Sequence, residues 1–267
     1  MDKVVVVAPA IKVHHWQRLY VEFCRAKTPF HFVFVGHVRP NFKLPDNFTY
    51  IHCELGPAEC AEIAYRYAYK KITDAKYIIN IADDSTFPEY YLDKMNEFYV
   101  GQVAKEKNEF VIVSSLVNGY WNEENLMSLY DGGPTLLGPM YTTVNNSKKL
   151  GGIDSRFKAI YWDCDRHLRA HMLGGAVVYA TPEQVPTGRE LEYTPTGGLW
   201  NTYGKHDKGL LDDIWEVTEG EGTEIYCSSM VNVSGRPTNK LFKKKVKLSR
   251  DSEVLEYEDK HLGKYYE

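Results

Sequence analysis

The stretch YIINIADDS, residues 77–85, decides the fold because an apolar run passes directly into two adjacent acids. Such runs are typical of strands in a parallel sheet that helices cover on both faces. We predict a buried strand over residues 77–81, with Asp83 and Asp84 after its carboxyl end. Neighbouring carboxylates there are unfavourable unless a cation or hydrogen-bond donors compensate their charge. The local alternative is a turn or a helix N-cap, which Asp and Ser also favour.

Strands and helices alternate along the chain on both sides of this stretch. Further buried strands are predicted over residues 4–7, 30–35, 50–53 and 110–114. Apolar residues at helical spacing predict helices over residues 14–27, 58–72 and 89–106. This alternation indicates an α/β fold, with a mostly parallel, Rossmann-like central sheet flanked by helices.

Several strand-end loops are expected to converge on one edge of this sheet. In parallel sheets, ligands bind beyond the carboxyl ends of the strands. The loops at that position contain Ala8, Pro9, Ala10, Gly36, His37, Asp83 and Asp84.

A second pattern follows residue 150. The segment GGIDSRF, residues 151–157, precedes a helix predicted to begin near Trp162 and to stop at the pair Gly174-Gly175. Asp163 falls in the first turn of that helix and off its apolar stripe, which would leave the carboxylate free to face a cleft. The alternative role for Asp163 is a first-turn acid that interacts with the helix dipole.

Other side chains of this helix are predicted to be structural. Cys164, Leu168 and Met172 form an apolar stripe that would dock the helix on the sheet. Asp165 and Arg169 are spaced i,i+4 and are expected to pair.

Taken together, the two patterns resemble family 2 of the GT-A glycosyltransferases, over roughly residues 3–180. The resemblance implies a GT-A fold that transfers a sugar from a nucleotide-diphosphate donor to an acceptor hydroxyl with inversion. Asp84 matches the family's metal- and diphosphate-binding acid, and Asp163 matches its catalytic base. Pro9 with its neighbours Ala8 and Ala10, and the loop Gly36-His37, match positions that bind the nucleoside. The family's first acid of this motif falls on Ala82, so either Asp83 substitutes for it at the nucleotide or the ribose contacts differ.

The resemblance also implies a divalent ion, Mn²⁺ or Mg²⁺, on the diphosphate. Asp84 and Asp83 are its expected ligands, and His206 is a candidate for a further one, although an ordinary surface histidine is the alternative. This sequence departs from the family pattern at three places. Ala82 stands where the family has the first acid of its DxD-like motif, and Trp162 stands where it has a glutamate before the catalytic base. Gly36-His37 replaces the acidic pair that usually follows the second strand. These departures concern the donor more than the fold.

Bulk composition bears on possible partners. The chain has 267 residues and a formal net charge of −4, which gives no general attraction to nucleic acid or to anionic membranes. The apolar run from Val4 to Ala10 is too short to span a bilayer. A lysine-rich run over residues 240–247 could touch a membrane surface, but a solvated helix face is the simpler interpretation.

Cysteine usage suggests the compartment. The five cysteines are scattered, and no two form a C-x-x-C pair. We therefore expect reduced thiols and a cytoplasmic location.

The chain is expected to divide into a nucleotide-sugar half (residues 1–115), an acceptor and catalytic half of the same domain (116–235), and a charged C-terminal extension (236–267). Tyr120-Trp121, Tyr141 and Trp200 are aromatic residues expected in cleft loops, and the alternative for each is an ordinary core position. The expected partners are a UDP- or GDP-linked hexose donor and a carbohydrate or glycan acceptor. Two rival functions remain open: a sugar nucleotidyltransferase, and a non-catalytic carbohydrate- or nucleotide-binding module.

Overall fold

The structure, a computed structural model, describes residues 1–115, 139–180, 184–185, 198–219, 240–244 and 261–267. Its strands are β1 (Lys3–Pro9), β2 (Phe30–Gly36), β3 (Phe48–His52), β4 (Ala75–Asn80), β5 (Val111–Ser115), β6 (Met140–Thr143), β7 (Ala176–Ala180), β8 (Trp215–Glu219) and β9 (Lys240–Lys244). Its helices are α1 (Val13–Phe23), α2 (Pro57–Lys71), α3 (Tyr91–Glu106), α5 (Val144–Leu150), α6 (Trp162–Met172), α7 (Gly198–Ile214) and the 3-10 turn η1 (Gly263–Tyr265). The strands and helices predicted before residue 115 are all present.

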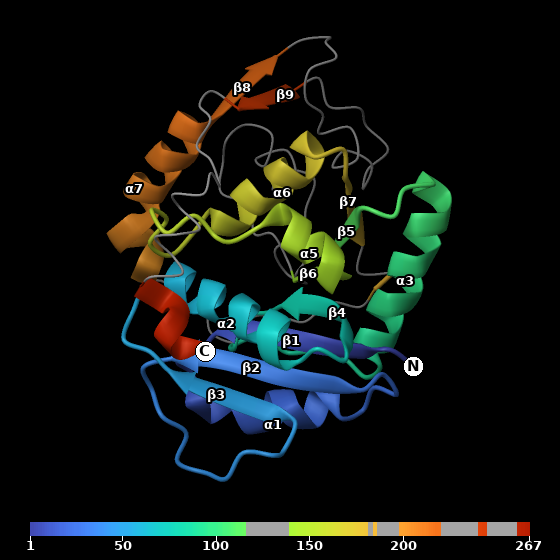
Figure 1. The fold of residues 1–267 in the computed structure, drawn as a ribbon, viewed down its shortest axis with the longest axis vertical. Coiled ribbons are helices and arrows are strands. Elements are labelled where there is room, and N and C mark those ends of the chain that lie inside the picture. Colours follow the sequence, from blue (N-terminus) through green and yellow to red (C-terminus); the bar gives the residue numbers. More distant parts are fainter. Residues whose placement is uncertain (116–138, 181–183, 186–197, 220–239, 245–260) are drawn as a thin grey trace.

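A seven-stranded sheet with the order β3-β2-β1-β4-β6-β5-β7 forms the centre of the fold (Figure 1). The pairs β2–β3, β1–β2, β1–β4 and β5–β7 are parallel, and β6 is antiparallel to both β4 and β5. The predicted α/β class with a mostly parallel sheet is therefore confirmed. The sequence did not indicate β6, which is short and pairs with strands far from it in the chain.

Helices cover both faces of the sheet. On β1, Val5 and Val7 pack into a core with α2 and α6, while Val4 and Val6 pack into a second core with α1 and α3. Figure 1 shows α1 and α2 on opposite sides of strands β1 to β3. Burial on both faces explains why β1 reads as a continuous run of valines.

The second half of the chain completes the same sheet through β6 and β7. Helix α6 begins at Trp162 as predicted, and Gly174 follows its end with a φ of 78°, as expected of a glycine C-cap. Cys164 and Leu168 are buried in the core, in agreement with the predicted docking stripe, while the side chain of Met172 lies outside the described residues.

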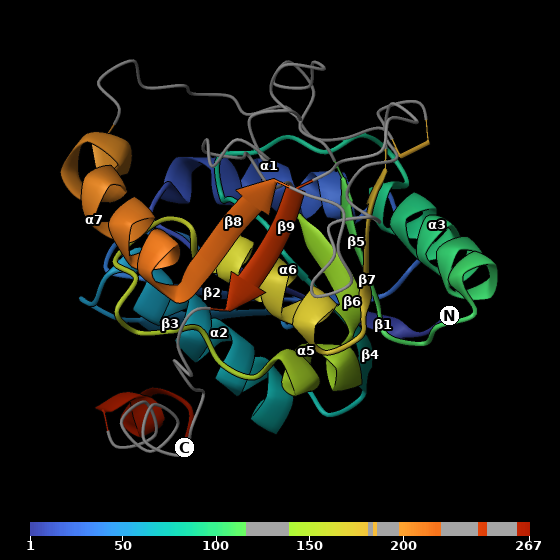
Figure 2. The same cartoon turned by 90° about the horizontal axis from the view of Figure 1, so that it is seen from above.

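Two expectations for this half are wrong. Residues 240–244 form strand β9, paired antiparallel with β8, and not a helix face, because pairing with a distant strand overrides local charge pattern (Figure 2). Tyr141 lies in β6, fully buried and stacked on Tyr77 with ring centroids 5.3 Å apart, so it is a core residue. Tyr120 and Trp121, and the side chain of Trp200, are outside the described part.

The described end of the chain returns to α2. Lys70 lies over the ring of Tyr266 at 4.6 Å, and Lys71 Nζ donates to the Glu267 carbonyl at 2.8 Å. Within the described ranges, no helix is both long enough and apolar enough to cross a bilayer.

Gly36→Ala should destabilise the protein. A Cβ at Gly36 would overlap the carbonyl oxygen of Ala10 and lie 2.9 Å from its carbonyl carbon, so two strand ends would have to separate. We expect the free energy of unfolding in denaturant to fall by about 1–3 kcal/mol.

Gly101→Ala is the matched control. A Cβ there meets nothing within 4 Å, and the residue is exposed in the interior of α3. This variant should be more stable than wild type by about 0.5–1 kcal/mol. Equal, wild-type stability of both variants would contradict the close approach at Gly36.

Candidate active site at the carboxyl edge of the sheet

The ends of β1 and β2 lie against each other at the carboxyl edge of the sheet. Pro9 pairs with Val35 in the parallel ladder, and the Ala10 N–H donates to the Val35 carbonyl at 2.8 Å. Gly36 is buried beside Ala10, whereas His37 is exposed. The predicted convergence of these loops is present.

Asp83 ties the end of β4 to the loop that follows β1. Its Oδ2 accepts hydrogen bonds from the Ile11 N–H at 2.7 Å, the Lys12 N–H at 2.6 Å and the Trp16 Nε1–H at 3.1 Å. Burial raises the pKa of Asp83, and these hydrogen bonds oppose that rise. Hydrogen-bond donors of the chain thus compensate this carboxylate.

Helix α1 also binds the remainder of the loop that follows β4. Arg18 donates from Nη2 to the Ser85 carbonyl at 2.8 Å, and Glu22 Oε2 accepts from the Phe87 N–H at 2.9 Å. Residues 83–87 are therefore fixed to α1 at successive points, which gives Asp84 a defined position.

Asp84 forms an ion pair with Lys12. The Lys12 Nζ lies 2.5 Å from Asp84 Oδ2, and the two side chains are 24% and 12% exposed. Because both groups keep some solvent contact, a ligand at this edge can reach the pair.

The described residues do not assemble the predicted metal ligands. Among them, no group of three or more His, Cys, Asp or Glu side chains is placed to hold a metal ion. One oxygen of Asp83 already serves several N–H donors, and Asp84 faces an ammonium. His206 lies on α7, exposed, with Nδ1 2.8 Å from Asp207 Oδ1. The structure brings Asp83 and Asp84 together but not His206, so the described side chains do not by themselves complete a divalent site.

Asp163 is the second residue of α6, two positions after a residue in a strained conformation. Tyr161 has a φ of 63°, in the left-handed region that non-glycine residues rarely adopt. Asp163 is partly exposed, and its Oδ1 accepts from the Cys164 N–H at 2.9 Å. Burial raises the pKa of Asp163 to about 6. Its carboxylate is therefore suited to accept a proton near neutral pH.

The connections place Asp163 at the same edge as Asp84. Strands β4 and β5 are both antiparallel to β6, and β7 is parallel to β5, so β7 runs in the direction of β4. Helix α6 ends just before β7 begins, and its first turn therefore lies toward the carboxyl edge. One turn into the helix, His167 Nε2 lies 2.9 Å from Ser114 Oγ, near the carboxyl end of β5.

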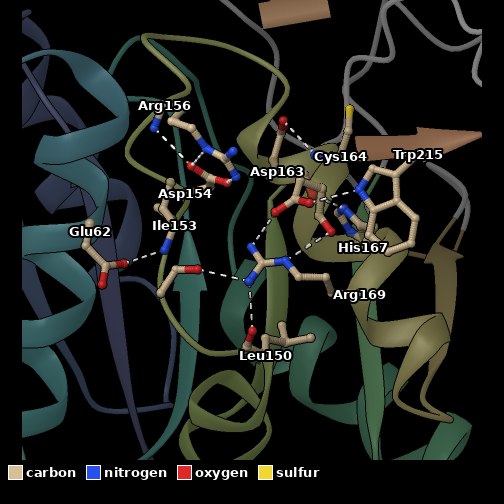
Figure 3. Close-up of polar contacts among 12 residues, drawn as sticks. Glu62, Leu150, Ile153, Asp154, Arg156, Asp163, Cys164, His167, Arg169 and Trp215 are labelled. Atoms are coloured by element: carbon tan, nitrogen blue, oxygen red, sulfur yellow. Dashed lines mark hydrogen bonds and ion pairs between the residues drawn. The ribbon is translucent and has the colours of Figure 1, made fainter. Parts of the chain in front are cut away.

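A buried ion pair beneath Asp163 holds several elements together (Figure 3). Asp165 Oδ2 lies 2.7 Å from Arg169 Nη2, which confirms the predicted i,i+4 pair. Arg169 Nη1 also donates to the carbonyls of Leu150 and Gly152 at 2.8 and 3.0 Å, and Trp215 Nε1–H donates to Asp165 Oδ1 at 2.9 Å. The pair thus joins the diglycine segment, α6 and the start of β8.

Asp207 fixes the loop that leads into α6. Its carboxylate is fully buried and accepts from the backbone N–H groups of Lys158, Ala159 and Ile160 at 3.0, 2.9 and 2.9 Å. The sequence pattern pointed to its neighbour His206 and not to Asp207. An acid that caps a distant loop carries no local signal.

Glu62 is a second residue that sequence reasoning missed. From α2, its Oε2 accepts from the Ile153 N–H at 2.7 Å (Figure 3). Its Oε1 pairs with Arg66 Nε at 2.5 Å. Its partner Ile153 lies 91 residues away, so no local pattern around Glu62 marks it.

Comparison with known proteins supports the fold. No protein-family model and no curated protein sequence matches this chain. Among solved structures, a mannosyltransferase of Pyrobaculum calidifontis, PcManGT, in complex with GDP-Man and Mn²⁺, is similar with a TM-score of 0.50 at 14% identity. The chain has the GT-A type of α/β fold.

Other solved structures match with lower TM-scores. They include S. aureus TarS, at 0.47 and 14% identity, and Drosophila β1,4-galactosyltransferase 7 with manganese, UDP-Gal and xylobiose, at 0.43 and 10% identity. The aligned regions cover 69%, 67% and 72% of this chain for TarS, PcManGT and the galactosyltransferase. The chain spans 62%, 55% and 72% of those three structures.

Asp207→Ala should destabilise the GT-A domain. The change leaves the N–H groups of residues 158–160 without their acceptor. The Ala159 N–H is buried and the other two are part-buried, and a buried unsatisfied group costs about 1–3 kcal/mol. We expect a loss of about 3 kcal/mol or more in the free energy of unfolding, measured in denaturant. Asp213→Ala, an exposed acid on the same helix, is the control and should change stability by less than about 0.5 kcal/mol.

Proposed function

We propose that this protein is a glycosyltransferase that moves a sugar from a nucleotide-diphosphate donor to an acceptor hydroxyl. The observation that carries the proposal is the shared edge of the sheet. It holds the Lys12–Asp84 pair after β1 and β4 and, on α6, a carboxylate whose pKa is raised to about 6. The similar fold of PcManGT, solved with GDP-Man, supports a nucleotide-sugar donor.

The donor is proposed to lie over the ends of β1, β2 and β4. Pro9 pairs with Val35 at these strand ends, and the neighbouring Gly36 has no side chain. The surface proposed to lie beneath the nucleoside therefore consists of backbone and small residues. Exposed Ile11 and His37 flank this surface. The family resemblance supports a UDP- or GDP-linked hexose.

Asp163 is proposed as the general base. Its carboxylate would accept the proton of the acceptor hydroxyl as that oxygen attacks the anomeric carbon and the bond to the diphosphate breaks. One base and one displacement suffice for this step, and a single displacement inverts the anomeric centre. The hydrogen bonds of Asp207 to residues 158–160 and the Asp165–Arg169 pair would keep Asp163 in place.

The leaving diphosphate requires compensating positive charge at the same edge. The family resemblance predicts Mn²⁺ or Mg²⁺ for this role, and that expectation stays a prediction. In the structure, the positive group beside Asp84 is the Lys12 ammonium.

The proposal is tested by incubating the protein with a panel of UDP- and GDP-hexoses and a panel of glycan acceptors. Release of nucleoside diphosphate together with a glycosylated product is the expected result. Release of pyrophosphate would indicate a nucleotidyltransferase. Donor binding without turnover or slow donor hydrolysis would indicate a binding module.

Asp163→Asn should remove transfer and spare donor binding. Asparagine is similar in size but cannot accept the proton, and general-base catalysis typically contributes about 10²–10⁴-fold to the rate. We expect turnover to fall by that factor, while donor affinity measured by calorimetry stays within about threefold of wild type. Near-normal turnover would show that Asp163 is not the base.

Transfer should depend on pH with a midpoint near 6. A base acts when deprotonated, so kcat/KM should rise as the pH increases through about 6 and then level off. The measurement is kcat/KM from pH 4.5 to 8 with stability checked at each pH. A profile that is flat across this range would contradict the assignment.

A further inference from the structure

We infer that Lys12 supplies the positive charge that binds the donor's diphosphate, so that this chain binds a nucleoside diphosphate without a divalent ion. The inference rests on the proposed function and concerns the same site. It departs from the metal that the family resemblance predicts.

The Lys12 ammonium lies beside Asp84. Lys12 Nζ lies 2.5 Å from Asp84 Oδ2, the carboxylate that the sequence marks as the metal ligand. The cation's place beside Asp84 is thus taken by a side chain of the protein itself. A divalent ion bound to Asp84 would lie close to this ammonium, and the two positive charges would repel each other.

Among the described residues, the neighbourhood of Asp84 offers few further ligands for a metal ion. The neighbouring acid, Asp83, uses Oδ2 to accept from Ile11, Lys12 and Trp16. An ion on Asp83 Oδ2 would compete with these three hydrogen bonds, which hold the start of α1. Across the described residues, no third side chain joins these two acids to complete a metal site.

The Lys12 side chain is held in position before any ligand binds. The Lys12 backbone is fixed because its N–H donates to Asp83, and the loop is anchored by Trp16, which is fully buried against the rings of Phe34, Phe48 and Tyr50. The Lys12 side chain is in turn oriented by Asp84. A positive charge held in place before the ligand arrives loses little freedom on binding.

The Lys12 ammonium is accessible to solvent and suited to bind phosphate. The Lys12 side chain is 24% exposed at the edge where ligands of parallel sheets bind. A lysine ammonium binds phosphate well as a point charge, whereas Asp84 alone would repel it. We expect the diphosphate to contact the ammonium while Asp84 continues to orient it.

The experiment is calorimetric titration of UDP and GDP into the full chain, in EDTA and in Mn²⁺. Wild type should bind at least one of them in EDTA, and Mn²⁺ should change the affinity by less than about threefold. Lys12→Met should weaken this binding about tenfold or more, the size expected of a charge-assisted hydrogen bond. Lys12→Arg should retain most of it, and uridine or guanosine without phosphate should respond little to either change.

Asp84→Asn separates the two models. If Asp84 holds a metal, this variant loses nucleotide binding in Mn²⁺. If Lys12 is the binding group, the variant keeps or gains affinity in EDTA because the ammonium no longer shares its charge with a carboxylate.

Two variants guard against a folding artefact. The double variant Lys12→Met with Asp84→Asn leaves no uncompensated acid and should still bind weakly in EDTA. Lys3→Met removes the same charge at the opposite end of β1, where Lys3 pairs with Asp74, and should bind like wild type.

The outcomes are distinct. Binding that is lost in EDTA and restored by Mn²⁺ would overturn the role of Lys12 and leave the proposed function intact. Lys12→Met binding as tightly as wild type in EDTA would do the same. Absence of UDP and GDP binding under both conditions would overturn the proposed function itself, and the role of Lys12 with it.

Discussion

The carboxylate of Asp83 is the group on which the candidate site depends. It sits at the end of a buried strand, where an uncompensated charge is unfavourable, and it resolves this by accepting from two backbone N–H groups and the Trp16 indole. Those donors belong to the loop after β1 and to α1. One buried carboxylate thus fixes the loop after β4 to the loop after β1, and the relative position of Lys12 and Asp84 follows from that attachment.

Three acids at this edge have different environments and therefore different capacities. Asp83 is satisfied by hydrogen bonds and acts structurally. Asp84 is paired with an ammonium that keeps contact with solvent. Asp163 accepts a hydrogen bond from the Cys164 N–H, and burial raises its pKa to about 6. The contrast supports a division of roles between binding negative charge near Lys12 and accepting a proton at Asp163.

The second half of the site is held by buried polar contacts between distant segments. Arg169 binds Asp165 and the carbonyls of Leu150 and Gly152, while Asp207 caps the backbone of residues 158–160. These contacts flank the strained Tyr161, two residues before Asp163. Such strain persists only where surrounding interactions determine the backbone, and the network supplies them.

The sequence by itself determined the α/β class, the strands and helices before residue 115, the start of α6 and the Asp165–Arg169 pair. Each of these follows from local periodicity, from glycine signals or from i,i+4 spacing, which act over short stretches of chain. It also pointed to Asp83, Asp84 and Asp163 as acids in positions that need an explanation. Only the tertiary structure decided what compensates each charge, that Tyr141 belongs to the core, that β6 and β9 exist, and that Asp207 rather than His206 is the buried member of its pair. Those features depend on partners tens of residues away, and the strength of a hydrogen bond or ion pair is set by the distance and burial that folding creates, which no local pattern records.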